Sequence, residues 1–268
     1  MKIGIAGSKG FIGSSFKHYL KSKDISYSVL DDDLRVLDNF NYGQNVDTLV
    51  LLASLKPKIG INTGVHEYLS DNYLIVLNAL EYCRRVGAKL LYVSTFLYDL
   101  KSSLPIDELS PIVANSPYQF SKLLGEDLCQ YYSKKKGVNT IILRPSNVYG
   151  GKIDTGNFID TLLNSEHINH DIFRPEDRRD FVHVTDLCAA ILKGCEKVKD
   201  YTFEVFNIGS GESNSKYEII DTLGIRNKCN VHDSQEEFTD TQYCVSKAFN
   251  LLDWSPKVKL VTFLSLQT

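Results

Sequence analysis

A tyrosine and a lysine four residues apart have the types and spacing needed for acid–base chemistry. They are Tyr118 and Lys122 in the segment "SPYQFSK". Residues at i and i+4 of a helix share one face, so the ammonium can lower the pKa of the phenol and hold a nicotinamide ribose. The phenol can then exchange a proton with a carbinol or carbonyl oxygen during hydride transfer. Such a pair also occurs on ordinary amphipathic helices, so other motifs must support it.

Two hydroxyl residues lie at the end of a predicted strand that precedes this helix. Ser94 and Thr95 close the apolar run "LLYVST". Ligands of open parallel sheets bind at the carboxyl ends of the strands, which makes both hydroxyls candidates for substrate contact. Serine and threonine also cap turns after strands, and we expect that simpler role for at least one of them.

Three glycines at spacing three, Gly7, Gly10 and Gly13, follow the first apolar run in "KIGIAGSKGFIG". Glycine at this place permits a tight turn, a close approach of backbone N–H groups to a pyrophosphate, and close packing of the next helix. The N-terminus of that helix favours an anion. The spacing therefore predicts a dinucleotide site, although a tight turn alone would also explain it.

An aspartate at the end of the second predicted strand is expected to bind the adenosine ribose of the dinucleotide. Asp31 lies 18 residues after Gly13, where a carboxylate can accept hydrogen bonds from adenosine ribose hydroxyls. It would repel a ribose phosphate, which favours NAD, although Lys9 and Arg35 could still serve NADP. The alternative is that Asp31 merely begins the acidic run 31–33.

The elements that must position these residues alternate along the chain. Three stretches predict helices, at 13–23, 70–87 and 116–137, and the last two close on glycine. Runs rich in Val, Ile, Leu, Tyr and Phe predict buried strands at 2–6, 26–31, 47–53, 89–95, 139–144 and 203–208. This alternation predicts an α/β fold, a Rossmann-type doubly wound parallel sheet.

Two regions depart from the alternation. Residues 32–46 are short and polar, so they leave room only for a brief helix or a loop. After Gly150 the rhythm breaks. We expect a Rossmann domain at 1–150 plus about 181–211, and a smaller C-terminal part at about 151–180 and 212–268 that covers the carboxyl edge of the sheet.

Composition excludes several classes of protein. The 268 residues are 43% hydrophobic and 24% charged, with a net charge of −3, which is typical of a globular protein without a basic field for nucleic acid. No apolar run approaches a membrane span, and Met1 leads directly into a strand-like run without a signal-peptide pattern. We expect a cytoplasmic protein that binds neither nucleic acid nor membrane.

The six cysteines are scattered without a C-x-x-C pair. Neither a metal site nor a disulfide framework is indicated. We expect reduced thiols that are mostly buried.

The order of motifs along nearly the whole chain resembles one enzyme family. The motifs are "GSKGFIG", "VDTLVLLAS", "SDNYLIVLNAL", "LLYVST", "SPYQFSKLLGE", "LRPSNVYG", "RRDFVHVTDL" and "FEVFNIGSGE". Together they resemble the extended short-chain dehydrogenase/reductases that act on nucleotide sugars, the NAD-dependent epimerase/dehydratase family. The resemblance implies a bound NAD or NADP, a nucleotide-sugar substrate under the C-terminal part, and a homodimer formed by two helices of each subunit.

The resemblance also implies roles for individual residues. Tyr118 would be the acid/base, Lys122 its partner on the cofactor, and Thr95 the hydroxyl residue of the catalytic set. Ser94 takes that place if the alignment is counted back from Tyr98. The remaining implied cofactor contacts are Gly7, Gly10, Phe11, Ile12, Gly13, Asp31, Ala53 and Asn72, and the implied substrate contacts are Ser94, Thr95, Asn147 and Arg179.

Simpler interpretations accompany several of these residues. Asn72 could cap a helix, Ala53 could be core packing, and Asn147 could be a turn residue. Arg178 is expected to be a solvated neighbour of Arg179. His183 is expected to be structural, because a histidine on an alternating strand is more often a satisfied structural residue.

Departures from the family narrow the chemistry. Dehydratases of the family carry an aspartate and a glutamate after the threonine, whereas this chain has Phe96 and Leu97. Dehydration is therefore disfavoured under either alignment. The segment "DDDLRVLDN" is similar to one in GDP-fucose synthases, so the first expectation is a 4-keto-sugar reductase and the alternative is a nucleotide-sugar 4-epimerase. A non-catalytic cofactor-binding sensor is a third hypothesis, weakened because Tyr118 and Lys122 are both present.

Overall fold

A six-stranded parallel sheet forms the centre of the computed structural model, which describes residues 1–40, 46–56, 64–151, 156–164, 170–234 and 237–267. The strand order is β2-β1-β3-β4-β5-β9, and every neighbouring pair is parallel. The six strands are β1 (Ile3–Ala6), β2 (Tyr27–Leu30), β3 (Thr48–Leu51), β4 (Lys89–Val93), β5 (Thr140–Pro145) and β9 (Phe203–Ile208). All six predicted strands and the predicted Rossmann-type sheet are confirmed.

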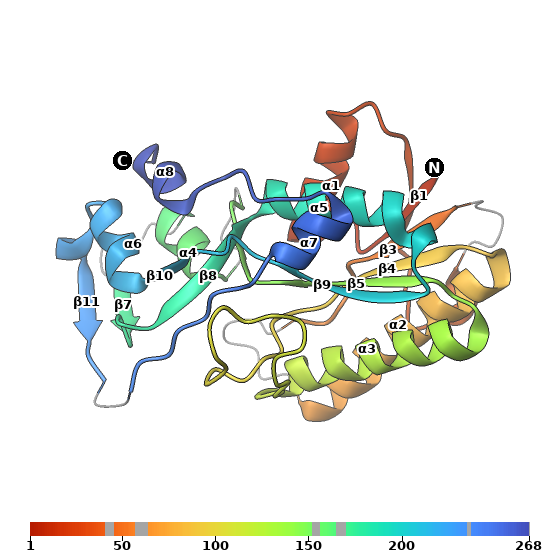
Figure 1. Cartoon of the computed structure of the whole chain (residues 1–268), viewed down its shortest axis with the longest axis horizontal. Coiled ribbons are helices and arrows are strands. Elements are labelled where there is room, and N and C mark those ends of the chain that lie inside the picture. Colours follow the sequence, from red (N-terminus) through yellow and green to blue (C-terminus); the bar gives the residue numbers. More distant parts are fainter. Residues whose placement is uncertain (41–45, 57–63, 152–155, 165–169, 235–236, 268) are drawn as a thin grey trace.

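Helices cover both faces of this sheet (Figure 1). One face carries α1 (Phe11–Lys21), α5 (Val184–Lys197) and α7 (Ser246–Leu252); the other carries α2 (Val65–Val86) and α3 (Pro117–Lys136). Each face has its own hydrophobic core. The inner strands β1, β3, β4 and β5 are almost fully buried, which explains why they read as continuous apolar runs, whereas the edge strands β2 and β9 are partly exposed.

The helix ends follow from local chemistry. Helix α3 begins at Pro117, after Ser116, whose hydroxyl accepts a hydrogen bond from the backbone N–H of Gln119 at 3.2 Å. Helices α2 and α3 end at Gly87 and Gly137, with φ of 74° and 73°, a left-handed conformation that glycine adopts without strain. The predicted closing glycines are confirmed, and Tyr118 and Lys122 lie in the first two turns of α3.

The region after β2 is short, as predicted. It contains only the 3-10 helix η1 (Leu37–Asn39), while the part at 41–45 lies outside the described residues. A second 3-10 helix, η2 (Val198–Asp200), connects α5 to β9.

The C-terminal part forms two small sheets beside the large one (Figure 1). A three-stranded sheet joins strands in the order β10-β8-β6, and a two-stranded sheet joins β11 and β7. The elements of this region are β6 (Asn147–Tyr149), α4 (Phe158–Asn164), β7 (His170–Phe173), β8 (Arg178–His183), β10 (Ser213–Ser215), α6 (Lys216–Thr222), η3 (Arg226–Lys228), β11 (Cys229–His232) and α8 (Leu260–Ser265). The division into two domains stays a prediction.

Two further features bear on the class of protein. No helix in the described part of the chain is long and apolar enough to cross a membrane. Four of the six cysteines are buried, namely Cys83, Cys129, Cys188 and Cys195. The expectation of mostly buried thiols is confirmed.

Candidate active site

Lys122 lies inside the protein, at the carboxyl edge of the sheet. Its side chain is 2% exposed, and its ammonium Nζ donates a hydrogen bond to the carbonyl oxygen of Val93 at 2.7 Å. The same Nζ lies 4.4 Å from the ring centroid of Tyr92, a cation–π distance. Burial lowers the pKa of Lys122 to about 7, and the nearby ammonium of Lys56 acts in the same direction.

Tyr118 lies half-buried one helical turn earlier, with its phenol between two hydroxyl groups. Burial raises the pKa of Tyr118, and hydrogen bonds with the side chains of Ser54 and Thr95 act in the opposite direction. The predicted lowering of this pKa by Lys122 is not seen. The reason is geometric, because Lys122 directs its ammonium to Val93 and is itself partly deprotonated near neutral pH.

Ser94 and Thr95 differ in their surroundings. Thr95 contacts the Tyr118 phenol, whereas Ser94 Oγ is buried without a hydrogen-bond partner among the described residues. A buried hydroxyl without a hydrogen-bond partner lowers the stability of the folded protein. Since both residues line the same cavity, the Ser94 hydroxyl is available to a ligand there.

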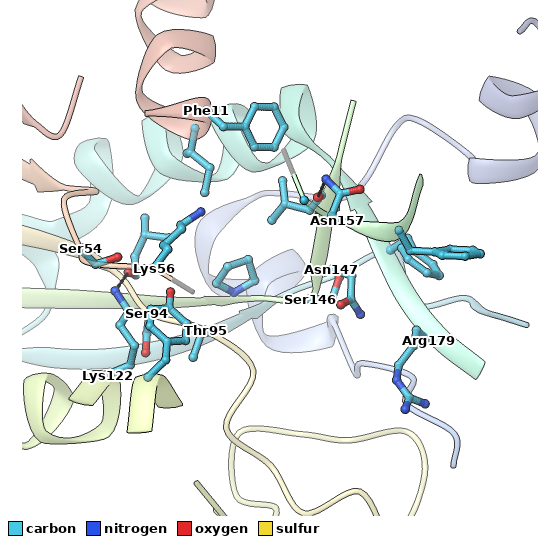
Figure 2. A pocket seen from close by; sticks show the side chains of 18 of the residues that line it. Phe11, Ser54, Lys56, Ser94, Thr95, Lys122, Ser146, Asn147, Asn157 and Arg179 are labelled. Carbon is cyan, nitrogen blue, oxygen red and sulfur yellow. Dashed lines mark hydrogen bonds between the residues drawn. The ribbon is translucent and has the colours of Figure 1, made fainter. Parts of the chain in front are cut away.

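These residues surround one cavity of about 610 Å³, within the usual size of small-molecule sites. Figure 2 shows side chains from both parts of the chain around it, including Phe11, Ser54, Lys56, Ser94, Thr95, Lys122, Ser146, Asn147, Asn157 and Arg179. The sequence analysis did not name Ser54, Lys56, Ser146, Asn157 or Lys216 as site residues. Ser54 could have been found from the sequence. It ends the apolar run that contains β3, just as Ser94 ends the apolar run that contains β4.

A second cavity lies beside the glycine loop. It is lined by Gly7, Lys9, Gly10, Phe11, Ile12, Gly13, Asp31, Asp32, Asp33, Leu34, Arg35, Leu52, Ala53, Ser54, Leu55, Lys56, Asp71 and Ile75. Phe11, Ile12, Leu52, Ser54 and Lys56 line both cavities. A long ligand could therefore extend from the glycine loop to Tyr118.

The glycine loop fits the pyrophosphate of a dinucleotide. A Cβ on Gly13 would lie 2.2 Å from the carbonyl oxygen of Gly7, and a Cβ on Gly7, whose φ is +90°, would lie 2.5 Å from the backbone nitrogen of Ala53. No larger residue fits either place. Helix α1 begins at Phe11, directly after Gly10, and its first N–H groups have no partner within the helix, so they can bind an anion there.

Asp31 contacts the glycine loop itself. Its Oδ1 accepts hydrogen bonds from the backbone N–H groups of Gly7 at 3.1 Å and Ser8 at 2.7 Å, and its Oδ2 accepts one from Ser8 Oγ. The sequence analysis missed this role, because nothing local links residue 31 to residue 8. Its predicted contact with the ribose stays a prediction.

Asn72 lies behind the loop that follows β3. Its Oδ1 accepts a hydrogen bond from the Leu55 N–H at 2.6 Å, and its Nδ2 donates to the Leu55 carbonyl and to Ser121 Oγ. The side chain thus fixes the loop that carries Ser54 and Lys56 to helix α3. Ala53 lines the cavity beside the glycine loop. Cofactor contact by Asn72 or Ala53 stays a prediction.

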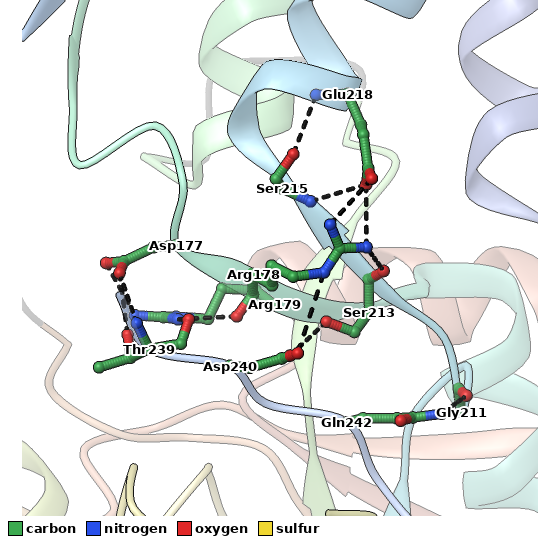
Figure 3. A network of polar contacts seen from close by, with 10 residues as sticks. All are labelled: Asp177, Arg178, Arg179, Gly211, Ser213, Ser215, Glu218, Thr239, Asp240 and Gln242. Carbon is green, nitrogen blue, oxygen red and sulfur yellow. Dashed lines mark hydrogen bonds and ion pairs between the residues drawn. The ribbon is translucent and has the colours of Figure 1, made fainter. Parts of the chain in front are cut away.

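The two predicted substrate contacts in the C-terminal half line the first cavity. Asn147 Nδ2 donates to the carbonyl of Asp180 at 3.0 Å, which directs strand β6 along β8. Arg179 donates to the carbonyl of Thr239 at 2.9 Å and to Asp177 Oδ2 at 3.2 Å (Figure 3). Hydrogen bonds from Arg174 and Thr239 outweigh the effect of burial and hold the pKa of Asp177 at about 2.

Arg178 is paired and lies outside the described cavities. It donates to Glu218 at 2.8 Å and to the carbonyl of Ser213 at 2.6 Å, and it lies 3.9 Å from Asp240 (Figure 3). It therefore ties helix α6 to strand β8, which differs from the solvated neighbour that the sequence predicted.

His183 is structural, as predicted. Its Nδ1 lies 2.7 Å from Thr185 Oγ1 and accepts the Thr185 N–H at the start of α5. Among the described residues, no group of three or more His, Cys, Asp or Glu is placed to hold a metal ion.

Comparison with known proteins places this arrangement in a family. The sequence model of the NAD dependent epimerase/dehydratase family matches residues 3–209. The chain belongs to this family. The predicted enzyme class, an NAD(P)-dependent nucleotide-sugar-modifying enzyme of the short-chain dehydrogenase/reductase superfamily, is confirmed.

Relatives within the family include two kinds of enzyme. A UDP-glucose 4-epimerase of Mycoplasma pneumoniae is 29% identical in an alignment that covers 82% of this chain and 80% of that protein. A GDP-L-fucose synthase of Sinorhizobium fredii is 26% identical in an alignment that covers 97% of this chain and 91% of that protein.

Solved structures of the family have the same fold. A UDP-glucose-4-epimerase from Stenotrophomonas maltophila, with bound NAD and formylated UDP-arabinopyranose, superposes with a TM-score of 0.87 at 17% identity, covering 100% of this chain and 96% of that chain. The RMD structure from Pseudomonas aeruginosa, complexed with NADPH, gives a TM-score of 0.80 at 21% identity and covers 99% and 97%. At these identities the likeness concerns the fold alone.

Proposed function

We propose that this family member is a nucleotide-sugar 4-epimerase. The observation that carries the proposal is the Tyr118 phenol, which lies beside the Thr95 and Ser54 hydroxyls and one helical turn from the buried Lys122, in a cavity that shares lining residues with the one beside the glycine loop. The epimerases among its sequence relatives favour this activity over the reductase expected first from the sequence.

The chain's own residues suit the proton half of such a reaction. A nicotinamide cofactor, when bound, supplies reversible hydride acceptance. As the phenolate, Tyr118 would take the proton from a sugar hydroxyl while hydride leaves the same carbon for the cofactor, and it would return the proton when hydride comes back to the other face of the rotated keto sugar. Thr95 and Ser54 hold the phenol in place, and Arg179 binds the diphosphate of the nucleotide sugar with its planar guanidinium.

NAD is the proposed cofactor, in preference to NADP. Three aspartates, Asp31, Asp32 and Asp33, line the cavity beside the glycine loop. Carboxylates there can accept bonds from ribose hydroxyls and repel a phosphate on the same ribose. The preference for NAD depends on the charge of this cavity alone. The related structures do not distinguish the two cofactors, because one contains NAD and another contains NADPH.

A coupled assay separates the candidate activities. Epimerisation is redox-neutral, so we expect interconversion of UDP-glucose and UDP-galactose with catalytic NAD and no net change in absorbance at the nicotinamide band. Normal cofactor binding without turnover of any nucleotide sugar in a panel would instead support the sensor hypothesis.

The second candidate is a 4-keto-sugar reductase. It is favoured by the full-length similarity to GDP-L-fucose synthases and by the segment 31–39, which resembles theirs. A reductase would consume one NADH or NADPH per 4-keto sugar. Stoichiometric oxidation with a keto-sugar nucleotide, and no interconversion of UDP-hexoses, would replace the first proposal by this one.

A homodimer is part of the proposal. Helices α2 and α3 pack side by side and expose Tyr73, Leu74, Phe120 and Tyr131, and large apolar side chains exposed on such a helix pair are available to a second subunit. We expect a dimer by light scattering and a monomer after Leu74→Arg. The control is Phe249→Arg, because Phe249 is exposed on α7, on the other face of the sheet.

A further inference from the structure

An arginine in the cavity beside the glycine loop is held between two carboxylates. Arg35 Nε and Nη2 each donate to Asp33 at 2.8 Å, and Arg35 Nη1 donates to Asp71 Oδ2 at 3.0 Å. Asp33 follows β2 and Asp71 lies on α2, so the cluster bridges two elements. The hydrogen bonds from Arg35 hold the pKa of Asp33 at about 2, so this carboxylate stays charged at neutral pH.

The charge of the cluster opposes an additional phosphate. Arg35 carries one positive charge and its two partners carry two negative charges. Around them the cavity adds the carboxylates of Asp31 and Asp32, against the ammonium groups of Lys9 and Lys56. An arginine near this place can bind the 2′-phosphate of NADP in Rossmann folds, but here its donors are already directed at carboxylates.

We propose that the Asp33–Arg35–Asp71 cluster determines cofactor choice, by neutralising the arginine that would otherwise bind a 2′-phosphate. The inference rests on the proposed dinucleotide site at the glycine loop. It assigns discrimination against NADP to two carboxylates outside the Asp31 position. Asp31 is occupied by the Gly7 and Ser8 N–H groups and contributes mainly its charge.

The expected size of the effect follows from the exposure of the cluster. Side-chain exposure is 48% for Arg35, 43% for Asp33 and 24% for Asp71. Ion pairs at this exposure contribute little individually and are screened by salt. We therefore expect Asp33→Asn or Asp71→Asn to raise the affinity for NADPH relative to NADH roughly threefold, and the double variant roughly tenfold.

The experiment is a fluorescence titration of the full chain with NADH and with NADPH at low salt, supported by thermal melting of each variant. Asp38→Asn is the control. Asp38 lies on η1 and is exposed; its replacement removes the same charge without touching Arg35. We expect it to leave the ratio of the two affinities unchanged.

Arg35→Ala in the Asp33→Asn/Asp71→Asn background completes the test. If the released guanidinium binds the phosphate, this third change must abolish the gain in NADPH affinity. An unchanged ratio in the double variant overturns the inference, as does a gain that persists without Arg35 or appears equally in Asp38→Asn. Failure of the unaltered chain to bind either nucleotide would instead contradict the proposed function.

Discussion

The cavity of the candidate active site has two walls, which hold their charges in different ways. The Rossmann wall includes Ser54, Lys56, Tyr118 and Lys122, and the C-terminal wall includes Asn147 and Arg179. On the Rossmann wall, the ammonium of Lys122 is buried against a backbone carbonyl, and its pKa falls to about 7. On the C-terminal wall, Arg179 is bonded to the carboxylate of Asp177, whose pKa is held at about 2. One wall contains an ammonium group that can change protonation near neutral pH. The other contains charges that stay fixed.

This difference assigns different work to each wall. Proton transfer needs an acid or base that can reach the reacting oxygen. Tyr118 offers a phenol inside the cavity, and burial lowers the pKa of Lys122, one helical turn away, to about 7. Binding a diphosphate needs a permanent charge in a fixed orientation, which Arg179 has through Asp177 and Thr239. We therefore expect variants of the two walls to separate turnover from substrate affinity.

The largest expected effect is on turnover, from Tyr118→Phe. The change removes the phenol oxygen and leaves the ring, so turnover should fall by about 10²- to 10⁴-fold while the affinities for cofactor and nucleotide sugar stay near normal. Steady-state rates and direct binding titrations measure the two quantities.

Tyr68→Phe is the matched control for this prediction. Tyr68 is buried, and its ring lies edge-on to that of Tyr118, with centroids 6.3 Å apart. We expect near-normal turnover from this control. If Tyr118→Phe also retained near-normal turnover, the Rossmann wall would not be the site of proton transfer.

The second expected effect is on stability, from Glu126→Gln beneath the Rossmann wall. Glu126 lies on α3, one turn after Lys122, and its Oε2 is 2.6 Å from Arg144 Nη2, with both side chains about 5% exposed. Arg144 also donates to Tyr98 at 2.8 Å. An unpaired charge left in this core should lower the free energy of unfolding by about 3–5 kcal/mol.

Urea unfolding measures this loss, and an exposed ion pair supplies the comparison. Asp221 and Arg226 are 2.9 Å apart, but both are about half exposed. Asp221→Asn should therefore cost less than about 1 kcal/mol. Equal losses in the two variants would show that the support of α3 does not depend on the buried pair.

The Rossmann half was predictable from sequence because its information is local. The helix predicted at 116–137 is observed at Pro117–Lys136, and the glycine spacing located the turn before α1. Apolar runs and capping residues set these elements within a few residues of chain. Tyr118 and Lys122 could be placed on one face for the same reason.

The side-chain partners could not be predicted, because they come from distant segments. Asp31 bonds to Ser8, Asn72 to Leu55, and Asp177 to Thr239, which lies 62 residues away. The hydrophobic periodicity of a sequence does not predict such hydrogen-bonded pairs. The same holds for the choice between epimerase and reductase, which the relatives informed better than the residues did.

The third expected effect is on substrate affinity, from Arg179→Ala. Loss of a charged donor to a diphosphate should raise the Michaelis constant for the nucleotide sugar roughly 10- to 100-fold, with little change in cofactor affinity. Asp177→Asn should give a smaller increase, because the guanidinium remains but loses a carboxylate partner. Loss of cofactor affinity in Arg179→Ala would mean that the two walls are not independent.

The smallest expected effect is the pH dependence that Lys122 contributes to stability. Its pKa is about 7 in the folded chain and 10.5 when unperturbed, so between these values the unfolded chain binds more protons than the folded one. Stability should therefore rise with pH from about 7 upward, and below pH 7 the full cost of the buried ammonium is present.

The buried cysteines limit the pH range of the measurement. Burial raises their pKa, so above about pH 9 they lower stability as the pH rises. The useful window is therefore pH 7 to 8.5. The melting temperature, measured against Lys122→Met, should rise by roughly 2 °C per pH unit in this window. Parallel curves for the two proteins would mean that Lys122 keeps its charge in the folded state, and that the Rossmann wall holds a fixed cation as the C-terminal wall does.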